Sequence, residues 1–98
     1  MNLDQKMAFK LKDGVICEMV DQDMILFYPD TNCIVNLNRT ASKICKLLQD
    51  KTDFSLLVDL FYDQFQEAGR PSKKTVENDV RNILEKLEQN GMLSSYES

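Results

Sequence analysis

The side chains with the greatest chemical potential in this sequence are three cysteines, Cys17, Cys33 and Cys45. A structural zinc site normally takes four ligands, often from closely spaced C-x-x-C pairs, and the sequence has no such pair. An odd number of cysteines also cannot form a complete set of disulfides. Because reduced cysteine is among the most buried residue types, we expect three buried free thiols and neither a metal site nor a disulfide framework.

The second chemical feature is that the sequence contains no histidine. This absence removes the commonest general base, the commonest metal ligand and every Ser–His or Cys–His pair. The carboxylates are scattered over turns and helix faces and do not suggest a paired acid–base site. The three glycines, Gly14, Gly69 and Gly91, are too far apart for a phosphate-binding loop. We therefore predict a protein that is not an enzyme, with no catalytic residues and no cofactor.

The net charge of −4 narrows the choice of partners. An acidic chain is repelled by phosphate groups, so neither nucleic acid nor an anionic membrane is an expected partner. No apolar run approaches the roughly 20 residues that cross a bilayer, and the first residues do not follow the order of a signal peptide. We therefore expect a cytoplasmic protein.

The first third of the chain predicts three short strands, over residues 15–20 (VICEMV), 24–28 (MILFY) and 33–37 (CIVNL). Asp21–Asp23 supplies one turn and Pro29–Asn32 the other, with Asn32 tolerant of a left-handed conformation. Turns this short indicate an antiparallel meander with residues 24–28 in the middle. The third strand then lies at an edge of the sheet.

The residues before the meander also have a strand pattern, because Met7, Phe9 and Leu11 alternate with less apolar residues. Residues 1–14 could hold a further strand that covers the opposite edge of the meander. They could equally exchange with a second subunit. The chain is therefore expected to be a monomer or a strand-exchanged dimer.

Three helices are predicted after the strands. The first begins after Asn38 and has an apolar face formed by Ala41, Ile44, Cys45 and Leu48. The second spans about 54–67, is capped by Thr52 or Asp53 and carries Leu57, Leu60, Phe61 and Phe65 on one side; residues 68–71 break it. The third spans about 73–90, begins after Ser72 and stops at Gly91, with Met92 and Leu93 folding back onto the core. The fold class is α+β, with a three-stranded antiparallel sheet followed by three α-helices in one domain over residues 1–98.

Two features of the sequence are not needed to form a small hydrophobic core and could serve binding. The predicted edge strand has neither Lys nor Pro, and an open edge can accept an extended peptide as an added strand, unless another segment or subunit covers it. The third helix carries a broad apolar stripe, formed by Val76, Val80, Ile83, Leu84 and Leu87. These five residues either pack only in the core or also form one wall of a groove beside the third strand.

The stretches 18–48 and 75–93 resemble the PqqD family of peptide chaperones, also called precursor-peptide recognition elements of ribosomally synthesised and post-translationally modified peptides. The most specific match is Leu37–Asn38 before Thr40–Ala41–Ser42, which follows the family's Leu-Asn-x-Thr-Ala entry into the first helix. Asp79–Val80, Leu87 and Gly91–Leu93 match the closing helix. The family's turn before the third strand typically contains glycine, where this chain has Thr31–Asn32.

The resemblance implies a winged-helix-like domain that binds the leader of a precursor peptide as a fourth strand along the third strand. By position, the main chain of Cys33, Ile34, Val35 and Asn36 would pair with the leader. The pocket would be lined by Val76, Val80, Ile83, Leu84 and Leu87, so Leu84→Arg is expected to weaken leader binding without unfolding the domain. The chain is too short to include an enzyme, which implies a separate one, such as a radical-SAM maturase or the leader peptidase and cyclase of lasso peptides.

Two other functions remain open from the sequence. A winged-helix DNA-binding transcriptional regulator has similar elements, but it would need a basic recognition helix, and residues 71–90 carry as many acidic as basic side chains. A structural tether subunit of a maturase complex could use the same strand edge, and it differs only in not binding a free peptide.

Overall fold

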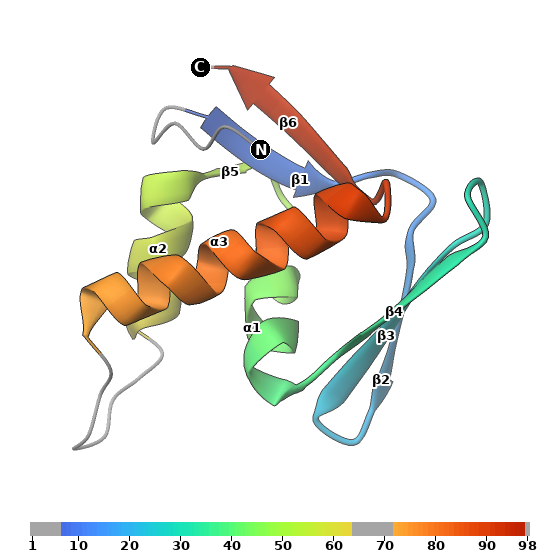
Figure 1. Ribbon diagram of the computed structural model, residues 1–98, viewed down its shortest axis with the longest axis horizontal. Helices are drawn as coiled ribbons and strands as arrows, with labels where there is room; N and C mark the ends of the chain where they lie inside the picture. Colours follow the sequence, from blue (N-terminus) through green and yellow to red (C-terminus); the bar gives the residue numbers. More distant parts are fainter. Residues whose placement is uncertain (1–6, 64–71, 98) are drawn as a thin grey trace.

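The computed structural model describes residues 7–63 and 72–97 of the chain (Figure 1). Its elements in chain order are β1 (Met7–Leu11), β2 (Ile16–Val20), β3 (Asp23–Tyr28), β4 (Cys33–Leu37), α1 (Arg39–Leu47), β5 (Thr52–Asp53), α2 (Phe54–Asp63), α3 (Lys73–Gln89) and β6 (Leu93–Glu97). The predicted α+β class, with a three-stranded antiparallel sheet followed by three helices, is confirmed.

The meander is the sheet β2–β3–β4, with β3 in the centre as predicted. Its two turns need a left-handed residue each, and Asp21 and Asn32 supply them with φ angles of 58° and 55°. Asparagine and aspartate tolerate this conformation better than most residues. The replacement of the family's usual glycine by Asn32 therefore leaves the turn before β4 intact.

The predicted N-terminal strand is present, but the prediction that it pairs with the edge of the meander is wrong. β1 does not cover the edge of the meander; it lies in a second sheet of order β5–β1–β6 and pairs along its full length with β6. Ala8, Phe9 and Leu11 are buried, and the amide of Lys12 donates to the carbonyl of Met92 at 2.9 Å. Burial of these apolar side chains against the helices therefore holds β1 away from the meander.

The helix caps follow the sequence closely. Asn38 Oδ1 accepts from the amide of Ala41 at 2.9 Å, and Ser72 Oγ accepts from the amide of Thr75 at 3.2 Å. Asp53 Oδ1 accepts from the amide of Leu56 at 2.7 Å, so Asp53 rather than Thr52 caps α2. These bonds satisfy amides that have no partner inside a helix.

The second helix is described as far as Asp63, and the rest of its predicted span, with Phe65 and the break at 68–71, lies outside the described residues. Leu57 and Phe61 are fully buried as predicted, whereas Leu60 is 39 % exposed. Leu60 flanks the stripe that Phe54, Leu57, Val58 and Phe61 direct into the core. Its predicted place on the buried side is therefore wrong.

The end of α3 is set by Gly91, which has a φ of 71°. The amide of Met92 donates to the carbonyl of Leu87 at 2.9 Å, and the amide of Gly91 donates to the carbonyl of Glu88 at 3.0 Å. This pair of bonds is a Schellman motif, which needs a left-handed residue after the helix. It turns the chain so that Met92 and Leu93 return to the core, as predicted.

The helices lie between the two sheets, with β1 and β6 on one side of α3 and the meander on another (Figure 1). α1 contacts β3 and β4, α2 contacts β1, and α3 contacts β6. The core between them includes Phe9, Leu26, Ile44, Leu48, Leu57, Phe61, Leu84 and Met92. None of the helices in the described part of the chain is long and apolar enough to cross a membrane.

Candidate functional site

Strand β4 has an open edge. It pairs with β3 on one side, and no strand among the described residues pairs with its other side. Val35 and Leu37 point into the core with 3 % and 2 % exposure, whereas Ile34 is 64 % exposed. The strand therefore anchors the sheet through alternate side chains and leaves its outer main chain accessible.

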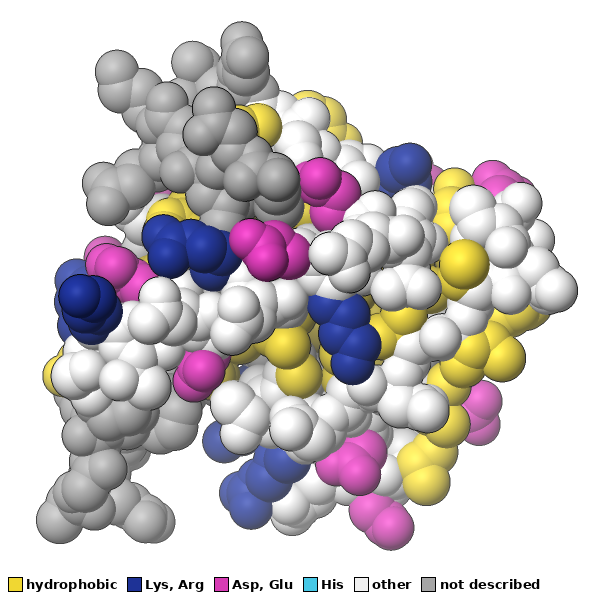
Figure 2. Space-filling view, in the orientation of Figure 1, with side chains coloured by type: hydrophobic (Ala, Val, Ile, Leu, Met, Phe, Trp, Pro, Cys, Tyr) yellow, Lys and Arg dark blue, Asp and Glu magenta, His cyan; other side chains and the backbone are white. Residues whose placement is uncertain are grey.

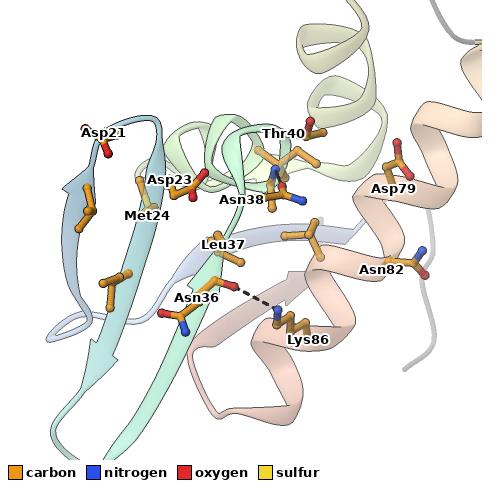
Figure 3. Close-up of a pocket in the computed structure, with 15 residues that line it drawn as sticks. Asp21, Asp23, Met24, Asn36, Leu37, Asn38, Thr40, Asp79, Asn82 and Lys86 are labelled. Carbon is orange, nitrogen blue, oxygen red and sulfur yellow. Dashed lines mark hydrogen bonds between the residues drawn. The ribbon is translucent and has the colours of Figure 1, made fainter.

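The direction of the free main-chain groups follows from one contact. Lys86 Nζ, on α3, donates to the main-chain oxygen of Asn36 at 3.2 Å, so this oxygen points away from β3 (Figure 3). In an antiparallel pair, successive residues alternate between bonding the partner strand and facing outward. Ile34, two residues earlier, therefore directs its amide and carbonyl to the same open edge as Asn36.

A groove of about 820 Å³ lies beside this edge. It is bounded by the β2–β3 turn, the end of β4, the start of α1 and one face of α3 (Figure 3). Its apolar lining is formed by Val20, Met24, Ile25, Leu37, Ala41, Ile44 and Ile83. A volume in this range fits several side chains of a bound peptide, since small-molecule sites span roughly 300–1,000 Å³.

The structure divides the five apolar residues that the sequence singled out on α3. Val76, Val80, Leu84 and Leu87 are fully buried in the core, each with 0 % exposure. Ile83 is half-buried and lines the groove. Because Leu84 is fully buried, the structure changes the expected effect of Leu84→Arg from weakened leader binding to loss of the folded domain.

The groove face of α3 is a second row of residues, formed by Asp79, Asn82, Ile83 and Lys86. Their spacing of i, i+3, i+4 and i+7 puts them on one side of a helix, next to the buried stripe. The sequence places Ile83 in the same apolar stripe as the four core residues, as one of five candidates for the groove wall, and it does not single out Asp79, Asn82 or Lys86 as site residues. The signal that could have separated Ile83 is its position at the margin of the stripe, flanked by polar residues at 79, 82 and 86.

The charges of the groove are unevenly placed. Asp21 and Asp23 lie at the β2–β3 turn and Asp79 lies on α3, whereas Lys86 is beside β4 (Figure 3). Opposite charges attract more strongly in a partly enclosed site than in bulk water. The end of the groove near the turn therefore favours a basic or neutral ligand group, and the Lys86 side favours an acceptor.

The prediction that the thiols are buried is correct for Cys45 and wrong for Cys17. Cys17 is exposed, Cys33 is half-buried, and Cys45 is fully buried. Burial raises the pKa of the Cys45 thiol to about 12, because the thiolate loses its hydration. Over the residues that the structure describes, no group of three His, Cys, Asp or Glu side chains could hold a metal ion.

We expect a water-soluble thiol reagent at pH 8 to modify Cys17 readily and Cys45 only when the domain opens, because the thiolate is the reacting species. Peptide mass spectrometry of the labelled protein over time separates the sites. Unfolding in denaturant should make their rates equal. Equal rates in the native protein would contradict the burial of Cys45.

Comparisons with known proteins show the family to which the chain belongs. The family model of coenzyme PQQ synthesis protein D (PqqD) matches residues 23–93, which is more than half of the chain. No curated protein matches the sequence.

Three solved structures are similar. TbiB1 in complex with the TbiA(beta) leader peptide has 25 % identity and a TM-score of 0.75, over 91 % of this chain and 99 % of that chain. Lasso peptide synthetase B1 complexed with the leader peptide has 21 % identity and a TM-score of 0.70, over 88 % and 96 %. The PqqD truncation of Methylobacterium extorquens PqqCD, a stand-alone RiPP recognition element, has 17 % identity and a TM-score of 0.74, over 95 % of each chain.

All three structures share the fold of this chain. The family model begins in the central strand of the meander and ends just after the Schellman turn, so it contains the open strand β4 and the groove face of α3. The chain therefore belongs to the PqqD family.

Proposed function

We propose that this protein binds the leader segment of a ribosomally synthesised precursor peptide and presents the peptide to a separate modifying enzyme. The observation that carries the proposal is the open edge of β4 beside an apolar groove. TbiB1, with 25 % identity to this chain, is a protein whose structure contains a bound leader peptide.

The leader would bind as an extended strand along β4. The amide and carbonyl groups of Ile34 and Asn36 would bond its main chain, and the flanking Cys33 and Val35 would hold β4 in register with β3. Lys86 would have to release the oxygen of Asn36, because a leader amide takes its place. The main-chain ladder supplies affinity with little dependence on the leader sequence.

Specificity would come from the groove. An apolar leader side chain that points toward α3 would contact Ile83 and Leu37. Val76, Val80, Leu84 and Leu87 would contribute indirectly, because they fix the position of α3 against the core. A basic leader residue near the β2–β3 turn would meet the carboxylates of Asp23 and Asp79.

Presentation would follow from tethering. A bound leader keeps the rest of the precursor near the enzyme, and a short flexible linker gives an effective concentration on the order of millimolar. The ordering of a flexible leader costs conformational entropy. A few apolar contacts must therefore provide enough favourable free energy to exceed this cost.

The proposal includes the type of the modifying enzyme, its location and the oligomeric state of this protein. The enzyme would be a radical-SAM maturase or a leader peptidase with a cyclase, and it would act with this protein in the cytoplasm. β1 pairs with β5 and β6 of the same chain, which favours a monomer over a strand-exchanged dimer.

The direct test is a titration of isotope-labelled protein with the leader peptide encoded beside its gene, followed by amide chemical shifts. We expect shifts at Ile34, Asn36, Ile83 and Lys86 that saturate at micromolar peptide. A shuffled leader of the same composition is the control. Shifts spread evenly over the domain, or no shifts at all, would count against the proposal.

The two alternative functions predict other outcomes of the same titration. A DNA-binding regulator would respond to duplex DNA, although the meander and its turns, residues 13–38, contain five carboxylates and no Lys or Arg. A structural tether would respond to the enzyme and not to free leader.

A further inference from the structure

The outer face of the meander, next to the open edge of β4, is a second surface that no element among the described residues covers. The cross-strand register places Ile16, Phe27 and Ile34 in one row across the sheet, and Glu18, Ile25 and Asn36 in the next. Ile16 is 53 % and Ile34 64 % exposed. With Val20 and Ile25, they give this side of the sheet the hydrophobic patches that Figure 2 shows over β2–β4.

The charged side chains of the meander itself all have one sign. Asp13, Glu18, Asp21, Asp23 and Asp30 are the only charged residues between Lys12 and Arg39. The meander therefore presents an apolar centre with an acidic border formed by its own side chains, and the basic Lys86 of α3 lies beside it at the open edge of β4. Contiguous exposed apolar surface of this kind marks interaction sites.

The acidic border decides which partner fits. A second copy of this chain would bring the same carboxylates together, and a β2–β2 pairing centred on Glu18 would place the two Glu18 side chains opposite each other, which is destabilising. Nucleic acid and anionic lipid carry the same sign of charge and are repelled as well. The complementary surface is an apolar patch of another protein, bordered by lysine or arginine.

We propose that the outer face is the docking surface for the modifying enzyme, an inference that rests on the proposed leader-binding function. Val20 and Ile25 belong to the outer face and also line the groove, and Ile34 has its side chain on the face and its main chain at the open edge. A protein docked on this face therefore borders the leader. Because an added leader strand extends the same sheet, its outward side chains enlarge the surface that the enzyme contacts.

This continuity couples the two binding events. The exposed apolar residues of the meander alone form a small patch, and a stable interface buries roughly 1,200–2,000 Å² in total. The leader strand supplies part of the missing area, so the enzyme binds the leader-loaded protein more tightly than the free protein. By linkage, the enzyme tightens leader binding by the same factor.

The test uses the peptide-modifying enzyme encoded next to the gene of this chain, purified by itself, as the probe. Its affinity for the full-length protein is measured by calorimetry, with and without saturating leader and at two salt concentrations. Ile16→Ser and Glu18→Lys are the test variants, because both side chains lie on the outer face away from the groove. Leu56→Ser on α2 and Glu88→Lys on α3 are matched controls at exposed positions.

We expect Ile16→Ser and Glu18→Lys each to weaken enzyme binding about tenfold, as for residues at the centre of an interface, and to leave leader affinity unchanged. Glu18→Lys should also flatten the dependence of enzyme affinity on salt. The control variants should bind the enzyme as the parent protein does.

Enzyme affinities that are equal for the test and control variants would overturn the inference. A concentration-dependent dimer in sedimentation that Ile16→Ser abolishes would overturn it too, because the face would then be occupied by a second copy. Failure of the parent protein to bind leader would instead reject the proposed function, and enzyme binding without leader would still show whether the outer face is used.

Discussion

Replacing Ile34 by proline is expected to reduce leader affinity about tenfold or more while the domain stays folded. The amide of Ile34 faces the open edge of β4, so its loss removes no bond to β3. Proline is tolerated on edge strands with this orientation. The leader loses one main-chain bond, worth about 0.5–1.5 kcal/mol, and meets the proline ring where it should approach.

The neighbouring position provides the opposite outcome. The amide of Val35 bonds β3 by the same alternation, and its side chain is 3 % exposed. Val35→Pro should therefore destabilise the domain by about 3 kcal/mol or more. Chemical denaturation measures the stability of both variants, and calorimetry with leader measures binding.

Ile34→Val is the control for the lost side chain, because it keeps the amide and the β-branched shape. It should bind leader as the parent protein does. Normal leader binding by Ile34→Pro would show that the leader does not pair with β4 and would remove the main support for strand addition.

Adjacent substitutions on α3 are expected to separate folding from binding. Leu84→Arg should unfold most of the protein, because Leu84 is fully buried and a charge there has no partner. Truncation of a buried leucine alone costs about 2–5 kcal/mol, against a total stability of about 5–15 kcal/mol for a domain. Thermal unfolding by circular dichroism checks this result.

Ile83→Arg should leave the fold intact and weaken leader binding about tenfold. Ile83 is half-buried and lines the groove, so an arginine can extend into solvent, but the apolar contact with the leader is lost. Glu88→Arg, at an exposed position of α3, is the matched control. Unfolding by Ile83→Arg, or its normal binding of leader, would show that the groove is assigned to the wrong face of α3.

Local structure was predictable wherever one residue sets the conformation or the hydrogen bonds of the backbone close to it in the chain. Asn38 and Ser72 begin helices because their oxygens accept from nearby amides. Asn32 and Gly91 allow left-handed backbone, which sets the turn before β4 and the end of α3. These effects depend on neighbours in the chain, so the sequence carries them completely.

The pairing of β1 could not be predicted in the same way. Its partner β6 consists of residues 93–97, at the other end of the described chain, and its sequence LSSYE has no strand-like alternation. β6 forms because the Schellman turn and the burial of Leu93 bring it alongside β1. Strand propensity is weak compared with such tertiary contacts.

The sequence by itself determined the three-stranded meander, the starts of the three helices and the presence of an apolar strand at an edge, because strand and helix periods are local properties. The tertiary structure alone decided that Ile83, and not Leu84, faces the groove. Both residues fit the same helical stripe, and the packing of α1 and α2 against α3 buries one and leaves the other at the margin. It also decided that Lys86 reaches Asn36, since that contact depends on how α3 lies beside β4.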